Sequence, residues 1–175
     1  SKSIDLKYEK KDIYGIIIEV IENYKEKFAI KDLIVNYKSC NLEVKIDKEL
    51  IQYCLKNIID NSIKYSNDKG AIEIECFMPC FDSSVDYYGD FVTNAIPENY
   101  NIYVIKIRDH GLGFSKKSLN NLFNSFYNED PAHHSEGFGL GLIVSKLIIE
   151  AHRGSISVGN IKTGGAEISI FLPIE

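Results

Sequence analysis

The 175-residue sequence has no tryptophan, a single methionine, and no run of pure aliphatic residues longer than three, as at 16–18. A helix that crosses a bilayer needs about 20 apolar residues, and no signal-peptide pattern opens the sequence. Excess positive charge is also missing, because 20 Lys and Arg stand against 25 Asp and Glu for a net charge of −5. The summed field therefore repels nucleic acid and anionic lipid, and we expect a soluble domain that binds neither.

The four cysteines form no Cys-x-x-Cys pair and have no nearby histidine at the spacing of a zinc site; they are Cys40, Cys54, Cys76 and Cys80. Free thiols in a reducing compartment, the cytoplasm, are the favoured interpretation. With 45% hydrophobic and 26% charged residues, the composition is that of a globular protein. A chain of this size supports one substantial core, so we expect a single domain over residues 1–175.

Apolar residues at helical spacing predict a helix over residues 13–28, capped by Asp12, and a second over residues 48–65, capped by Asp47 and ending near Ser66. A short helix begins after Ser115, and a longer one runs from about residue 140 to Gly154, which suits a left-handed cap.

Alternating patterns predict strands at residues 33–37 and 42–46, paired as a hairpin, and at residues 72–76, 101–108, 155–158 and 166–172. The class is α+β: a two-layer α/β sandwich with one mixed sheet and helices on one face. Residues 78–100 are long for a loop, and we interpret them as a hairpin insertion.

Asn57, Asn61 and Lys64 are spaced by four and three residues, so they share one stripe of the second helix. Neutral amide oxygens with one ammonium group suit a magnesium ion that already bridges phosphates. A solvated helix face is the alternative interpretation of this motif taken alone.

Two glycine-containing motifs follow. Asp109 precedes Gly111 and Gly113 directly after a strand; the glycines permit a tight backbone, and the carboxylate can accept hydrogen bonds from an amino group such as that of adenine. A plain glycine turn is equally compatible. Gly137, Gly139 and Gly141 open a helix, where free N–H groups can bind phosphate, although the pattern is neither a P-loop nor a dinucleotide fingerprint.

Together these motifs resemble the catalytic and ATP-binding domain of two-component sensor histidine kinases, in the wider superfamily of gyrase, chaperone and mismatch-repair ATPases. Residues 57–65 (NIIDNSIKY) are similar to the N box of that family and residues 109–113 (DHGLG) to its G1 box. Residues 122–127 (LFNSFY) are similar to its F box and residues 137–142 (GFGLGL) to its G2 box. The resemblance covers most of the chain and implies the Bergerat fold.

The resemblance also implies the roles of individual residues. Asn61 would ligate Mg²⁺ with Asn57 assisting, Lys64 would reach phosphate oxygens, Tyr65 would pack on the adenine of ATP, and Asp109 would receive its amino group. Gly111, Gly113, Gly137, Gly139, Leu140 and Gly141 would line the nucleotide, and residues 127–137 would form the ATP lid. Phe123 and Phe126 anchor the base of that lid or are simply core residues.

The resemblance implies transfer of the γ-phosphate of ATP to a histidine rather than rapid hydrolysis. Hydrolysing members carry Glu as a general base where Asn57 stands, and serine kinases of the superfamily also want an acid there. No acidic residue follows any of the four histidines, His110, His133, His134 and His152, as it follows most phosphoacceptors in the family.

We therefore expect the acceptor on a dimerisation helix hairpin upstream, so that this chain is the C-terminal part of a longer sensor. The expected partners are that phosphoacceptor domain and a response regulator, the isolated domain being monomeric and its parent a homodimer, cytoplasmic or anchored in the membrane. The alternative is a non-catalytic nucleotide-binding module, favoured by a lid segment without Lys or Arg between Tyr127 and Gly137.

Overall fold

The computed structural model describes residues 4–78, 91–93, 101–122 and 140–174. Its strands are β1 (Glu9–Asp12), β2 (Ile34–Lys38), β3 (Glu43–Ile46), β4 (Ala71–Phe77), β5 (Phe91–Thr93), β6 (Ile102–Asp109), β7 (Ser155–Asn160) and β8 (Ala166–Pro173). Its helices are α1 (Ile13–Asn23), α2 (Lys25–Ile30), α3 (Lys48–Tyr65), α4 (Lys116–Asn121) and α5 (Leu140–Ala151).

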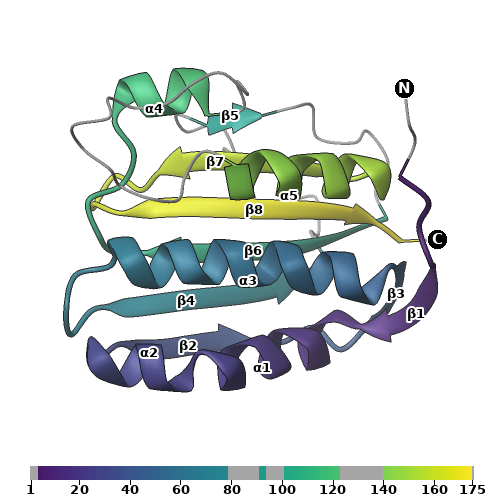
Figure 1. The fold of residues 1–175 in the computed structure, drawn as a ribbon, viewed down its shortest axis with the longest axis horizontal. Coiled ribbons are helices and arrows are strands. Elements are labelled where there is room, and N and C mark those ends of the chain that lie inside the picture. The colour runs from purple at the N-terminus through teal and green to yellow at the C-terminus, as the bar shows by residue number, and fades with distance from the viewer. Residues whose placement is uncertain (1–3, 79–90, 94–100, 123–139, 175) are drawn as a thin grey trace.

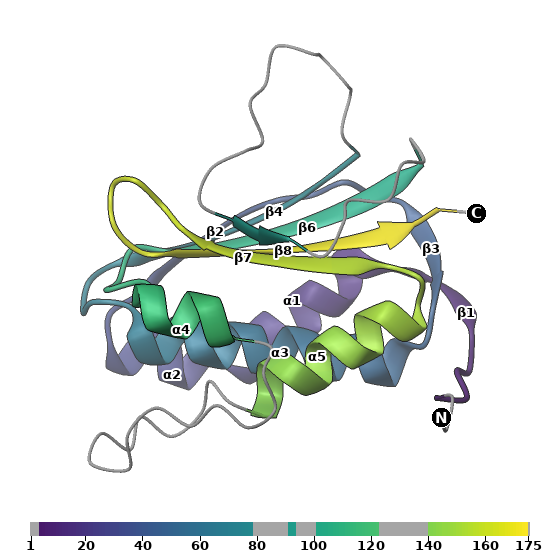
Figure 2. The ribbon, with the colours of Figure 1, turned by 90° about the horizontal axis from the view of Figure 1, so that it is seen from above.

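The main sheet has six strands in the order β2-β4-β6-β8-β7-β5, and the helices lie on one of its faces (Figures 1 and 2). The β2–β4 pair is parallel, and the other four pairs are antiparallel. β1 and β3 form a separate two-stranded sheet at one end of the molecule. The predicted two-layer sandwich with a mixed sheet is confirmed.

The core lies between the helices and the inner face of the sheet, because strand residues alternate between two faces while α3 turns one apolar stripe inward. Ile74 of β4, Ile105 of β6 and Ile170 of β8 are at most 2% exposed, and they lie against a helix layer that includes the fully buried Leu55 and Ile58 of α3. None of the helices in the described ranges combines the length and apolar character that a bilayer span requires.

Three predicted helix caps are confirmed. The Asp12 side chain accepts a hydrogen bond from Tyr14 N, Asp47 from Leu50 N, and Ser115 from Ser118 N. These bonds satisfy N–H groups that have no partner inside their own helix, which fixes where each helix begins. Asp12 thus caps α1, Asp47 caps α3 and Ser115 caps α4.

The helix predicted over residues 13–28 is wrong as one element, because the chain breaks at Tyr24 into α1 and α2. Phe28 in α2 is still buried, so the apolar spacing continues across the break and periodicity does not detect it. At the end of α5 the left-handed residue is Arg153, with φ 60°, and not Gly154 as predicted. Gly154 N bonds to Ile149 O and Arg153 N to Glu150 O, which is a Schellman end displaced by one residue.

The predicted hairpin between residues 33–37 and 42–46 is also wrong. Both segments are strands, but β2 pairs in parallel with β4 while β3 pairs antiparallel with β1. A parallel pair needs a long crossover connection, and α3 supplies it between β2 and β4. Within the predicted insertion, residues 78–100, the structure describes residue 78 and β5, which pairs with β7 at the edge of the sheet; the remaining residues lie outside the described part.

Candidate functional site

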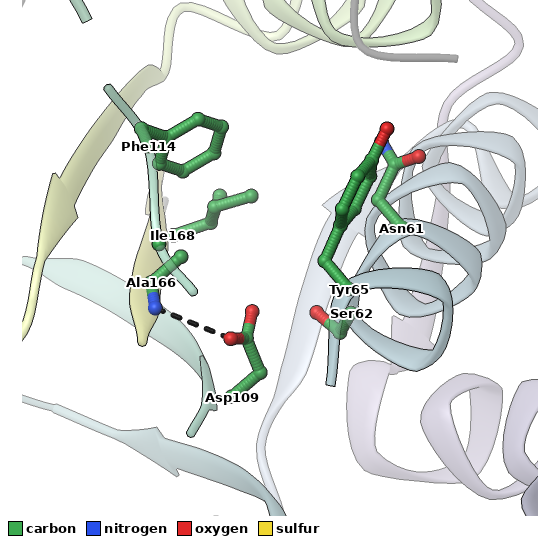
Figure 3. Close-up of a pocket in the computed structure, with 8 residues that line it drawn as sticks. Asn61, Ser62, Tyr65, Asp109, Phe114, Ala166 and Ile168 are labelled. Atoms are coloured by element: carbon green, nitrogen blue, oxygen red, sulfur yellow. Dashed lines mark hydrogen bonds between the residues drawn. The ribbon is translucent and has the colours of Figure 1, made fainter. Parts of the chain in front are cut away.

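A narrow pocket lies where the end of α3 meets the end of β6 and the start of β8, at the end of the sheet opposite β1 (Figure 1). Figure 3 shows its two walls: one comes from α3, and the other from β6, β8 and the loop after β6. The lining residues are Asn61, Ser62, Tyr65, Asp109, Gly113, Phe114, Ala166 and Ile168. The sequence predicted a binding role for four of them, namely Asn61, Tyr65, Asp109 and Gly113.

Asp109 is the only acidic side chain among the residues that line this pocket, and it is 5% exposed. One carboxylate oxygen accepts hydrogen bonds from Gly111 N at 3.0 Å and Ala166 N at 3.3 Å. The other oxygen points into the space between the walls (Figure 3). Burial raises the pKa of Asp109, opposed by the two backbone donors and by His110. A buried carboxylate with one free oxygen is an acceptor prepared for a donor from a ligand.

The loop after β6 passes directly over the end of α3 at Gly111. The Cβ of any other residue at this position would lie 1.9 Å from the Tyr65 carbonyl oxygen, which is a severe steric clash. The Asn67 side chain also donates to the His110 carbonyl oxygen at 3.2 Å. The absence of a side chain at Gly111 therefore brings Asp109 and Tyr65 to the same pocket.

The α3 wall carries a mixture of apolar and amide surface. Tyr65 is half-buried and faces Phe114 and Ile168 across the gap, and Asn61, one turn earlier, is 8% exposed (Figure 3). Lys64 is exposed and does not line the pocket; its Nζ lies 5.6 Å from the centre of the Tyr65 ring. The lysine thus stands at the rim, where a cation would meet the charged part of a ligand.

Asn57 lies one turn before Asn61 on α3 and faces the first turn of α5. A Cβ at Gly141 would be 3.4 Å from its amide carbon, and its buried Nδ2 has no hydrogen-bond partner among the described residues. No group of three or more His, Cys, Asp or Glu side chains in these ranges could hold a metal. The two amides fit a magnesium ion that takes few protein ligands and keeps phosphate and water in its remaining positions.

Five predicted site residues lie wholly or partly outside the described part of the chain. Phe123, Phe126, Gly137 and Gly139 lie outside the described residues, as does the predicted lid over residues 127–137. Leu140 is the first residue of α5, but its side chain is not described. For these residues the roles implied by the resemblance stay predictions.

The pocket is too small for a purine in this structure. It leaves about 10 Å³ for the centre of a water molecule, close to the room of a single water. A planar base can enter only if the Tyr65 and Phe114 rings move apart. Both rings are joined to the backbone by single bonds, so they can change rotamer while the sheet stays in place.

Sequence reasoning missed four lining residues: Ser62, Phe114, Ala166 and Ile168. The alternation of β8 already indicated that Ala166 and Ile168 share a face, so it could have placed them beside Asp109 once the pairing of β6 with β8 was known. Phe114 follows Gly113 in an irregular loop and carries no periodic signal.

Residues 46–175 match the protein family described as histidine kinase-, DNA gyrase B- and HSP90-like ATPases. The chain belongs to this family. The sensor histidine kinase SpaK of Bacillus subtilis is 27% identical over 98% of the chain. The match covers 34% of SpaK, so the chain spans about a third of that relative.

Solved structures of the family share the fold. Full-length ShkA in complex with AMPPNP superposes with a TM-score of 0.73 at 20% identity, covering 99% of this chain and 32% of that one. Histidine kinase ThkA in complex with the response regulator protein TrrA gives a TM-score of 0.71 at 18% identity, covering 97% of this chain and 42% of that one. The chain thus has the same arrangement of sheet and helices as these two histidine kinases.

Proposed function

We propose that the chain binds ATP through the pocket at Asp109, with the base between Tyr65 and Phe114. The observation that carries this proposal is the buried carboxylate whose second oxygen faces the gap while the first is held by two backbone N–H groups. An exocyclic amino group of a purine is a donor of the right kind for that oxygen. An aromatic wall on each side suits a flat, apolar ring.

The triphosphate would extend from the base along α3 toward the first turn of α5. Asn61 and Asn57 would hold Mg²⁺ through their amide oxygens, and Lys64 at the rim would reach phosphate oxygens. A bound magnesium ion supplies positive charge that offsets the charge of the phosphates. The N-terminal end of α5 adds a partial positive charge on the same side.

We further propose that the domain donates the γ-phosphate of ATP to a histidine on a dimerisation domain of its own parent, from which a response regulator then receives it. Asn57 cannot act as a base for water, whereas transfer to an imidazole needs mainly positioning and charge neutralisation. His152 is unsuitable as the acceptor within the chain, because it is 3% exposed and both ring nitrogens are hydrogen-bonded. A cytoplasmic catalytic domain of a dimeric sensor fits this role.

Calorimetric titration of the chain with ATP and Mg²⁺ tests the binding step. We expect one site, lost in Asp109→Ala and retained in Asp68→Ala, a control on the exposed turn after α3. The transfer step is tested by adding the phosphoacceptor domain of the parent protein and labelled ATP. Acid-labile phosphohistidine on that domain supports a kinase, and its absence despite ATP binding contradicts one.

The second candidate is a nucleotide-binding module without transfer activity. The segment 128–136 favours it, since it carries three acidic residues and no Lys or Arg that would hold the γ-phosphate. The same transfer assay separates the candidates.

A further inference from the structure

The far end of the loop after β6, which forms one wall of the pocket, is bound by a side chain from outside the pocket. Asn160, the last residue of β7, accepts a hydrogen bond from Phe114 N through Oδ1 at 2.7 Å and donates through Nδ2 to Phe114 O at 2.7 Å. One primary amide therefore pairs with both backbone groups of one residue, 46 positions away along the chain. Asn160 itself does not line the pocket.

The loop between Asp109 and Ser115 is held by bonds from side chains. Asp109 accepts from Gly111 N, Asn67 donates to His110 O, and Asn160 binds both backbone groups of Phe114. The Asn160 pair acts at the far end of the loop, where Phe114 turns toward the pocket. An amide that satisfies a backbone donor and acceptor together leaves its residue little freedom to rotate.

The Asn160 amide also packs against the turn at Gly113. Gly113 has φ +70°, a left-handed conformation that favours glycine, and a Cβ there would be 2.7 Å from Asn160 Oδ1. The Asn160 side chain thus lies directly against the backbone that reverses the loop. Phe114, the next residue, is 8% exposed and faces Tyr65 across the gap (Figure 3).

We propose that Asn160 is a positioning residue for the base site: it fixes the backbone of Phe114, so that the Phe114 side chain stays opposite Tyr65 when a purine enters between the two rings. The inference rests on the proposed function and adds to it the residue that sets the wall opposite α3. It acts through Phe114 and makes no contact with the nucleotide.

Titration of ATP and adenosine into Asn160→Ala tests the proposal, with Asn101→Ala as the control, an exposed asparagine at the other end of the sheet. We expect about tenfold weaker binding of both ligands in Asn160→Ala, since two hydrogen bonds that place the wall are lost. Asn160→Asp keeps the acceptor for Phe114 N and loses the donor to Phe114 O, so its affinity should fall between those of the parent chain and Asn160→Ala.

A merely structural role is separated by a double-mutant cycle with Phe114→Ala. If Asn160 acts through Phe114, the losses of affinity are not additive, and Asn160→Ala costs little further affinity once the ring is gone. Additive losses overturn the proposal, as does parent affinity in a folded Asn160→Ala. If Asn160→Ala does not fold, the same cycle is run with Asn160→Asp.

The outcomes also separate this inference from the proposed function. A parent chain that binds ATP while the asparagine variants bind equally well refutes the positioning role alone. A parent chain that binds neither ATP nor adenosine refutes the proposed function, and the positioning role with it.

Discussion

A buried aspartate lies at each end of α3, Asp47 as its cap and Asp109 on the neighbouring β6, and their hydrogen bonds differ. At the start, Asp47 is 7% exposed; its two oxygens accept from Leu50 N and Lys7 N, and its own N–H donates to His152. At the other end, Asp109 receives both of its bonds on one oxygen and turns the other into a gap.

The comparison teaches that burial alone does not distinguish a structural carboxylate from a binding one. Asp47 and His152 form a cluster whose partners all belong to the chain. The centres of the His152 and Tyr8 rings lie 5.8 Å apart, edge on, and His152 Nδ1 lies 2.7 Å from Ile148 O. Both Asp47 oxygens and both His152 ring nitrogens are hydrogen-bonded to groups of the chain, so the cluster stabilises the junction of the N-terminal segment, α3 and α5. Only one carboxylate oxygen of Asp109 is hydrogen-bonded, and the buried second oxygen lowers the stability of the fold unless a ligand donates a hydrogen bond to it.

The largest effect is expected on ATP affinity, from removing the charge of Asp109 in Asp109→Asn. The amide oxygen can still accept from Gly111 and Ala166, but the charge is lost, so ATP affinity should fall by about ten- to a hundredfold. Calorimetric titration measures the affinity, with Asp68→Asn as the control. Unchanged affinity contradicts the assignment.

Asp109→Asn should also alter the pH dependence of stability. Because burial raises the pKa of Asp109, the folded chain holds this proton more tightly than the unfolded chain. The carboxylate therefore costs stability above its ordinary pKa of about 4, increasingly as pH rises through the folded value. Measured by denaturant unfolding, the free energy of unfolding of Asp109→Asn should rise relative to that of the parent chain from pH 4 to pH 7. A difference between the two free energies that does not change with pH refutes this account.

The second largest effect is expected on stability, from Asp47→Ala. The substitution removes the cap of α3 and the bond from Lys7 N, so we expect the free energy of unfolding to fall by about 2 kcal/mol. ATP affinity should be unchanged, because the site lies at the opposite end of the helix. Asp5→Ala, in the exposed N-terminal segment, is the matched control. A loss of affinity in folded Asp47→Ala would break the distinction between the two ends.

A third effect follows from the buried histidine. Burial lowers the pKa of His152, opposed by its bond to Ile148 and the charge of Asp47. The unfolded chain therefore takes up this proton first, and unfolding free energy falls as pH drops below about 6.5, by at most about 1.4 kcal/mol per pH unit. His152→Asn should remove this part of the slope between pH 7.5 and 5.5, whereas His110→Asn, at an exposed site, should retain it.

The smallest effect is expected at an exposed pair that belongs to neither end. Lys27 Nζ lies 2.6 Å from an Asp60 oxygen, with side chains 55% and 42% exposed. Exposed pairs contribute little, so Lys27→Ala should change unfolding free energy by less than about 1 kcal/mol and leave ATP affinity unchanged. A larger change would show that charge at the surface of α3 matters as much as its buried ends.

The sequence predicted the local parts of both ends of α3. Asp47 as a cap and Asp109 at the end of a strand follow from residue type and position, because caps and strand ends are decided within a few residues. The Asp47–His152 bond joins residues 105 positions apart, and no pattern in the sequence indicates it.

Pairing between distant segments explains the errors. Periodicity identified β2 and β3 as strands, but their partners β4 and β1 depend on the packing of α3 across the sheet. The role of Asn160 could not be predicted either, because a contact between a side chain and the backbone of a remote loop leaves no periodic trace. The narrow gap between Tyr65 and Phe114 likewise depends on side-chain rotations that the sequence does not encode locally.

The most direct test of the central claim is a crystal structure of the chain with Mg²⁺ and a nonhydrolysable ATP analogue. The account predicts the base between Tyr65 and Phe114, its amino group within hydrogen-bond distance of the free Asp109 oxygen, and the phosphates between Asn61 and the start of α5. A nucleotide bound elsewhere, or a pocket still closed by the two rings at saturating analogue, would contradict it.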